Sequence, residues 1–191
     1  MSKIARNDNE DAVDRRSRIL DGARAAFMRY GFERSSMADI AAGAGVSRTA
    51  LYHYFPGKED VLQAVVDELH ARHLNAATEA LERSETLASA LAALIDAKFG
   101  RTLDLVTASP HGVELVDAGH RLTGPTIRDA DGSFHALMVK ALEHHGRTED
   151  ANAVADTLIA AARGLMRSGD SYVSKEKFDD RVHRIIAWTC K

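Results

Sequence analysis

The sequence predicts an all-α protein of two domains and nine helices. Apolar residues recur at helical spacing along nearly all of its 191 residues, and the two-residue alternation of a half-buried strand is hard to find. Ala and Leu are abundant, whereas the chain has only 3 Pro, 13 Gly and 6% aromatic residues, a composition that favours helices over sheets. Residues that commonly start or stop helices bound the periodic segments.

The N-terminal part is predicted to form three helices behind a flexible tail of residues 1–13. The first helix covers residues 14–30, and two shorter helices follow within a small domain of residues 14–57. Its boundaries come from residues with known capping or breaking roles: Gly31 after the first helix, Ser35 or Ser36 before the second, Gly45 in the turn, Ser47 before the third and Pro56 after it.

Residues 58–191 are predicted to form a larger helical domain. One of its helices carries Lys98 on the same stripe as the apolar Leu91 and Leu94. Six helices are expected here, opening at residues 57–60, after 84–86, and at 109–110, 124–125, 148–150 and 174.

Composition excludes several protein classes. A net charge of -3, 28% charged and 45% hydrophobic residues are values of a globular chain. The single cysteine, Cys190, cannot form a disulfide framework within one subunit and suits the reducing cytoplasm. No apolar run is long enough for a membrane span, and the polar start does not resemble a signal peptide. Motifs for nucleophilic, phosphate-binding, zinc or dinucleotide chemistry are absent, so we expect neither an enzyme nor a cofactor.

The segment SMADIAAGAGVSRTALYHYF, residues 36–55, reads as helix, glycine-containing turn and helix. This is the helix-turn-helix arrangement, whose second helix can enter the major groove of DNA. From Arg15 to Lys58 there are eight basic and three acidic residues, a surplus of +5 in a chain whose net charge is -3. A basic N-terminal region in an otherwise acidic chain would orient such a protein with that region toward DNA phosphates.

The run GVSRTALYHYFPGKEDVL, within residues 36–62, resembles the signature of the tetracycline-repressor (TetR) family of transcriptional regulators. The resemblance implies DNA binding by the first three helices, with effector binding and dimerisation by the rest. Met37 departs from the pattern, since some members have an arginine there. Tyr52 could instead serve packing alone. Carried over to this chain, the DNA-contacting residues are Ser36, Arg48, Thr49, Tyr52, His53, Tyr54 and Lys58.

A dimer of two-fold symmetry is expected because one helix-turn-helix makes too few DNA contacts for tight binding. Its seam is predicted on the last two helices, from Val154, Leu158, Ala161, Leu165, Val182, Ile185 and Trp188. The effector pocket is predicted among Phe99, Leu103, Val106, His111, Leu115, Phe134, Leu137, Met138 and Met166.

The resulting hypothesis is a cytoplasmic homodimer that binds a palindromic operator in double-stranded DNA and is released by a small effector. Repression is the commoner role in this family, and activation stays open. Metal sensing is an alternative, through His70 and His73 or through His111, Glu114 and His120. A helical enzyme is the remaining, disfavoured alternative.

Overall fold

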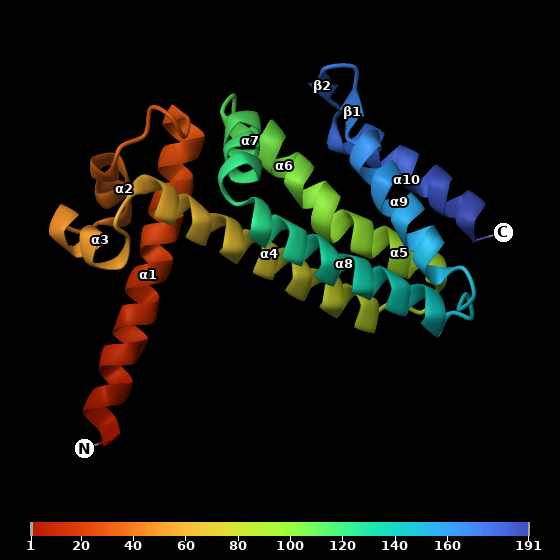
Figure 1. The fold of residues 1–191 in the computed structure, drawn as a ribbon, viewed down its shortest axis with the longest axis horizontal. Helices are drawn as coiled ribbons and strands as arrows, with labels where there is room; N and C mark the ends of the chain where they lie inside the picture. The colour runs from red at the N-terminus through yellow and green to blue at the C-terminus, as the bar shows by residue number, and fades with distance from the viewer. Residues whose placement is uncertain (1, 191) are drawn as a thin grey trace. The chain divides into compact units, whose positions relative to one another are not determined.

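The computed structural model describes residues 2–190, with side chains from residue 13 onward. The described residues form nine continuous helices and a small hairpin, which confirms the predicted all-α, two-domain class. The elements, all labelled in Figure 1 except η1, are α1 (Ser2–Tyr30), α2 (Met37–Ala44), α3 (Arg48–Tyr54), α4 (Lys58–Glu82), α5 (Leu87–Ile95), the π-helix η1 (Asp96–Gly100), α6 (Arg101–Thr107), α7 (Gly112–Leu122), α8 (Gly124–His144), α9 (Ala151–Leu165), β1 (Arg167–Ser168), β2 (Ser171–Tyr172) and α10 (Lys175–Thr189). Because α5, η1 and α6 follow one another without a break, they count as one helix.

Local capping explains why the short helices form where they do. The Ser36 hydroxyl accepts a hydrogen bond from the backbone N–H of Asp39 (3.2 Å), whose carboxylate accepts one from the N–H of Ser36 (2.9 Å). Gly45 ends α2 with φ +64°, in the left-handed region that glycine tolerates best. Ser47 caps α3 by accepting from the N–H of Ala50 at 3.1 Å.

Three features differ from the sequence-based expectation. Helix α1 begins at Ser2, so the segment expected as a flexible tail lies within a helix. Helix α7 begins at Gly112 and not at Ser109, whose hydroxyl donates to the carbonyl of Met28 (2.5 Å) and accepts from the N–H of His111 (3.0 Å) in the turn before the helix. The π-helix η1 and the antiparallel strand pair β1–β2 carry no signal that periodicity could detect.

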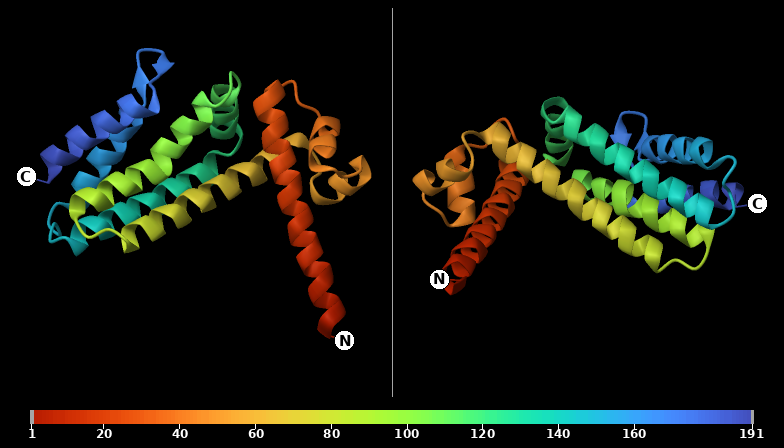
Figure 2. Two further views of the ribbon diagram at one scale, coloured as in Figure 1. Left: turned by 180° about the vertical axis from the view of Figure 1, so that it is seen from behind. Right: turned by 60° about the horizontal axis from the view of Figure 1, so that its bottom comes forward.

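The chain divides into two compact units: unit 1 is Met1–Glu68 with Ser109–Gly124, and unit 2 is Leu69–Ala108 with Pro125–Lys191. This division differs in two ways from the domain boundary expected at residue 58. Helix α4 continues across the division, and α7 belongs with the N-terminal helices. Both views of Figure 2 show the helices of unit 2 side by side as a bundle.

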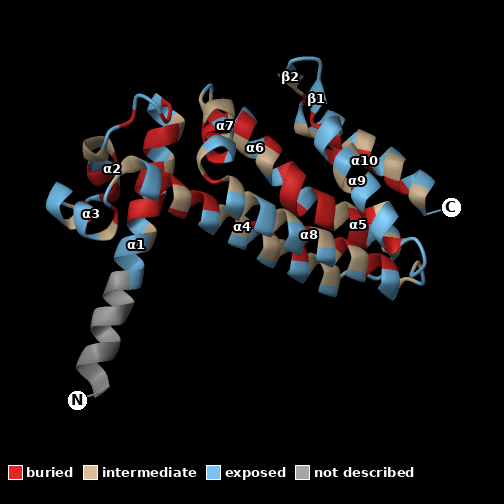
Figure 3. Cartoon of the chain, in the orientation of Figure 1, coloured by how far each residue is buried: buried red, intermediate tan, exposed pale blue. Residues whose placement is uncertain are grey.

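Unit 1 owes its shape to a close crossing of α1 and α2. A Cβ atom added at Gly22 would lie 2.5 Å from the backbone N of Ala44, so only glycine allows this approach. Figure 3 marks the buried positions of the helices of unit 1 in red. The fully buried side chains there include Ile19, Phe27, Ile40, Leu51 and Leu62.

Polar contacts hold α7 in unit 1 beside the end of α1. The backbone N–H of Glu33 donates to Oε1 of Glu114 at 2.9 Å, and Nη2 of Arg121 lies 2.7 Å from Oε1 of Glu33. The Ser109 hydroxyl adds its bond to Met28. Residues distant in sequence are thus joined around the loop that precedes α2.

Unit 2 is a helical bundle with an apolar core that includes Leu94, Leu103 and Met138. Its hairpin is fastened by Arg181 of α10, whose Nη1 donates to the carbonyls of Leu165 and Arg167, both at 2.9 Å. No helix in the part of the chain that the structure describes has the length and apolar character needed to cross a bilayer.

Candidate nucleic-acid interface

Helix α3 presents most of its polar and aromatic side chains outward. Arg48, Thr49, Tyr52 and His53 are exposed, and Tyr54 is half-buried. Leu51 is the residue that anchors the helix, with no exposed surface. Tyr52 is 53% exposed, so it is not a core residue. The outward face therefore combines a cation, a hydroxyl and aromatic groups, which are side chains that contact base edges and phosphates.

The ends of α3 are fixed by neighbouring elements. Its first turn is capped by Ser47, and the turn before it is closed by a bond from the N–H of Val46 to the carbonyl of Ala41 (3.0 Å). At its end, the guanidinium of Arg16 lies 5.8 Å from the ring centre of Phe55. Arg16 is exposed and adds positive charge beside α3, a contribution that the sequence analysis did not single out.

Ser36 is exposed at the start of α2, but its hydroxyl already takes part in the capping box. It donates to Oδ2 of Asp39 at 2.5 Å. These hydrogen bonds from Ser36 lower the pKa of the Asp39 carboxyl, with a smaller effect from the charge of Arg48. Asp39 therefore stays ionised near the start of α3. Ser36 itself is exposed to solvent although its hydroxyl is hydrogen-bonded.

Lys58, expected at a DNA phosphate, has internal partners. Its Nζ donates to the carbonyl oxygens of Phe32 (2.8 Å) and Glu33 (3.0 Å) and lies 4.6 Å from the ring centre of Phe32. This places the lysine as a clamp between α4 and the loop after α1. Since an ammonium has three N–H groups, one remains for a phosphate, and the predicted contact stays a prediction.

The histidines considered for metal binding have other surroundings. His73 is buried, and His70 meets it edge to face at 6.3 Å between ring centres. His111 Nδ1 lies 3.4 Å from Glu114, while its Nε2 lies 3.1 Å from the guanidinium of Arg34, a cation that would repel a metal ion. His120 is exposed. Within the described residues, no group of three or more His, Cys, Asp or Glu side chains is arranged to hold a metal.

The residues expected to line an effector pocket are divided between the units. His111 and Leu115 belong to unit 1, and the others to unit 2. Leu137 lines a hollow of about 270 Å³ together with residues of α4 and α8, including Leu81 and His144. The remaining predicted residues are buried among the helices of unit 2: Phe99, Leu103, Val106, Phe134, Met138 and Met166.

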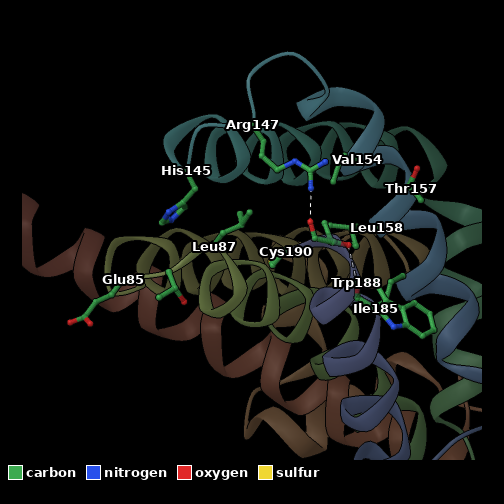
Figure 4. A pocket seen from close by; sticks show the side chains of 12 residues that line it. Glu85, Leu87, His145, Arg147, Val154, Thr157, Leu158, Ile185, Trp188 and Cys190 are labelled. Carbon is green, nitrogen blue, oxygen red and sulfur yellow. Dashed lines mark hydrogen bonds between the residues drawn. The ribbon is translucent and has the colours of Figure 1, made fainter.

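The residues expected at a dimer seam lie along α9 and α10. Trp188 is 71% exposed, whereas Leu158 and Val182 are buried in unit 2. The other four, Val154, Ala161, Leu165 and Ile185, are half-buried. A hollow of about 950 Å³ is lined by Val154, Leu158, Ile185 and Trp188 among others, and Figure 4 shows Arg147 donating a hydrogen bond across it to the carbonyl of Thr189.

Comparison with known proteins agrees with this architecture. Residues 19–65 match the family described as "Bacterial regulatory proteins, tetR family". The HTH-type transcriptional regulator TtgR of Pseudomonas putida is 40% identical over 70 residues, which make up 37% of this chain and 33% of TtgR. The match to TtgR thus spans about a third of that relative, and the family match at residues 19–65 contains the helix-turn-helix.

The fold of the whole chain also has solved counterparts. A transcriptional regulator from Aquifex aeolicus superimposes with a TM-score of 0.69 at 16% identity, covering 92% of this chain and 99% of that one. FadR from Bacillus subtilis, solved in complex with stearoyl-CoA, has a TM-score of 0.64 at 19% identity, covering 89% and 96%. At such identities the likeness concerns the fold, while the sequence match concerns the helix-turn-helix. Residues 19–65 therefore match the DNA-binding region of the TetR family of bacterial regulatory proteins, and the fold of the chain resembles that of solved transcriptional regulators.

Proposed function

We propose that this protein is a transcriptional repressor that binds a palindromic DNA operator as a homodimer and releases it when a small effector binds to unit 2. The observation that carries the proposal is the outward face of α3. It offers Arg48, Thr49, Tyr52 and His53 to solvent on a short helix fixed at both ends. Such a helix enters the major groove, where its side chains meet base edges.

Electrostatics support α3 as the DNA-facing element. Arg48 is exposed on it, and Arg16 lies at its end against Phe55. Arginines around a recognition helix attract phosphates without reading sequence, and they fix the register in which bases are read. The basic surplus of residues 15–58 within an acidic chain favours approach by this end.

The proposal of a dimer is supported by the surface of α9 and α10. A tryptophan as exposed as Trp188 is typical of interfaces. Along α9, Thr157 and Gly164 are exposed and Ala161 is half-buried, so small residues would let a second helix approach closely. We place the two-fold axis beside this surface, where two copies would form a four-helix contact.

The proposed effector site lies in unit 2 and follows from the family and from one solved neighbour. FadR from Bacillus subtilis is solved with stearoyl-CoA, and its fold resembles that of this chain. An effector reduces DNA binding to the extent that it favours a state in which the two α3 helices no longer match the half-site spacing.

Selection of bound duplexes from a random pool tests DNA reading. We expect a palindrome, since two copies of α3 read two half-sites. The affinity of the selected duplex is then measured by fluorescence anisotropy for Arg48→Ala and Tyr52→Ala. Arg48→Ala should weaken binding by about tenfold to a hundredfold, the range for a lost base contact. Arg83→Ala is the control, because Arg83 is an exposed arginine in the turn after α4 and pairs with Glu79 in the described structure. A wild-type protein that binds no duplex at low salt refutes the proposal.

Light scattering coupled to size-exclusion chromatography tests the dimer. At Gly164 a Cβ meets no atom within 4 Å, so Gly164→Leu should leave the protomer folded and obstruct pairing. Gly132→Leu on α8 is the matched control, since its Cβ position is equally open. Wild type and Gly132→Leu should be dimers and Gly164→Leu a monomer. A monomeric wild type at micromolar concentration contradicts the proposed assembly.

A further inference from the structure

A lysine lies buried in the middle of unit 2. Lys98 belongs to η1 and is 9% exposed, which is uncommon for a charged side chain. Its Nζ is hydrogen-bonded to Oδ1 of Asp131 on α8 and lies 4.9 Å from the ring centre of Phe134 and 6.0 Å from that of Phe99. The two rings meet edge to face at 5.9 Å. The ammonium is therefore enclosed by aromatic groups that stabilise a cation.

The charges around Lys98 do not balance. Asp131 accepts from Lys98 through one oxygen and from Nη2 of Arg163 through the other, at 3.1 Å. Two cations thus share one carboxylate. Among the described residues, Asp131 supplies the one acceptor for the three N–H groups of Lys98. Burial lowers the pKa of Lys98 and the bond to Asp131 partly opposes this, so a further anion at this place would favour the charged lysine.

A second buried group of unit 2, whose pKa is affected by the charge of Lys98, lacks a partner. His73 of α4 is 5% exposed, and its Nδ1 makes no hydrogen bond in the part of unit 2 that the structure describes. Burial above all, with contributions from His70, Arg101 and Lys98, lowers the pKa of His73 to about 4, so the ring is neutral at physiological pH. Buried polar atoms without a partner are rare and call for an explanation. A neutral imidazole can donate to or accept from a bound molecule.

The backbone at Lys98 is also irregular. The π-helix Asp96–Gly100 interrupts an otherwise regular helix and carries both Lys98 and Phe99. Such widened turns occur mostly at functional sites. From the surface inward, the exposed fractions of the side chains fall from 58% for Arg163 to 34% for Asp131 and 11% for Lys98. The polar side chains therefore lead from solvent to the buried ammonium.

We propose that Lys98, His73 and the Phe99–Phe134 pair form the recognition point for an effector that carries a carboxylate on an apolar or aromatic body. The carboxylate binds the Lys98 ammonium in place of, or beside, Asp131, and the His73 ring supplies a further hydrogen bond. The apolar body packs against the two rings. A cationic effector is disfavoured by the surplus positive charge. This inference rests on the proposed function and specifies the ligand class for unit 2.

Matched probe pairs test the ligand class. Benzoate and octanoate carry the carboxylate, and benzamide and octanamide are their uncharged counterparts. Thermal unfolding is followed at rising probe concentration, because a ligand of the folded state raises the midpoint. We expect the carboxylates to raise it in the millimolar range and the amides to leave it unchanged. A wild-type protein stabilised by neither carboxylate, or equally by the amides, overturns the inference.

Variants show whether the effect depends on this cluster. Lys98→Met keeps the volume and removes the charge, and it should weaken carboxylate binding by about tenfold or more. His73→Phe should weaken it less. Lys175→Met is the control, since Lys175 is a part-buried lysine paired with Asp96 and Asp179. If Lys98→Met does not fold, Lys98→Arg should keep the response. An unchanged response in both Lys98→Met and His73→Phe contradicts the assignment.

A DNA measurement separates this inference from the proposed function. Anisotropy of the selected duplex is recorded with and without benzoate or octanoate. If no duplex binds while the carboxylates still stabilise the protein through Lys98, the regulatory function fails and the ligand site stands. If the duplex binds and neither carboxylate stabilises the wild type, the ligand site fails and the regulatory function stands.

Discussion

Gly22 sets how closely α1 and α2 cross, and Gly22→Ala tests whether that crossing controls the stability of unit 1. The added Cβ would lie 2.5 Å from the N of Ala44 and 2.8 Å from the C of Gly43, where ordinary contacts begin at 3.4 Å. Both atoms belong to the backbone of α2, so no side chain can rotate away. Alanine gains up to about 1 kcal/mol of helix propensity over glycine, whereas overpacking a core costs about 1–3 kcal/mol. We expect a net loss of about 1–2 kcal/mol in the free energy of unfolding.

Two other glycines make the prediction specific. At Gly43 the nearest atom to an added Cβ is the carbonyl oxygen of Gly22 at 3.1 Å, so Gly43→Ala should cost less than Gly22→Ala. At Gly132 of α8 the space is open, and Gly132→Ala should stabilise unit 2 by about 0.5–1 kcal/mol. Urea unfolding gives the free energies, and amide exchange in α1 and α2 locates the change. The reasoning is refuted if Gly22→Ala is as stable as the wild type.

Three further predictions concern single polar groups. Glu114→Ala removes the acceptor of the Glu33 N–H and should lower the free energy of unfolding of unit 1 by about 1–2 kcal/mol. Glu114→Gln keeps an acceptor and should be close to wild type. If urea unfolding shows the same loss of stability in both variants, this hydrogen bond is not the cause. The pKa of His73 is 6.5 in the unfolded chain and about 4 in the folded protein. Between pH 6.5 and pH 4, His73 therefore takes up a proton in the unfolded chain and stays neutral in the folded one. Acid should therefore lower the free energy of unfolding by up to about 3 kcal/mol across this range, and titration of His73→Phe should lack this part of the change. Ser47→Ala removes the cap on the Ala50 N–H and should cost about 1 kcal/mol and weaken DNA binding, whereas an unchanged DNA affinity would show that α3 forms without its cap.

The sequence was most informative where a single residue determines local geometry. The turn at Gly45 needs a left-handed backbone, and a serine before a helix satisfies free N–H groups, so the positions of α2 and α3 could be predicted. The burial of Leu51 and the exposure of Arg48 follow from helical periodicity on a seven-residue helix.

Features that depend on distant partners could not be predicted in this way. Lys58 reads as an exposed cation in sequence, but its partners are carbonyls of residues 32 and 33 that only the fold brings near. The position of Lys98 on an apolar helix stripe indicates that this lysine is buried. Its partner Asp131 could not be predicted, because it is 33 residues away in the sequence. The π-helix has no periodicity of its own over five residues, and α7 gives no local sign that it joins unit 1.

The path of the chain suggests how a ligand in unit 2 could affect unit 1. The chain passes between the units within α4 and at both ends of α7. The helix formed by η1 and α6 precedes α7, and α8 follows it. Lys98 lies on η1 and Phe134 on α8, so the proposed ligand binds the elements that come before and after α7 in the sequence. Glu114 and Arg121 hold α7 in unit 1. A ligand can shift this arrangement only by its difference in affinity between two states. Glu114→Ala should therefore reduce the effect of octanoate on DNA affinity and leave the affinity for octanoate unchanged; a full effect in this variant would mean that α4 alone carries the coupling.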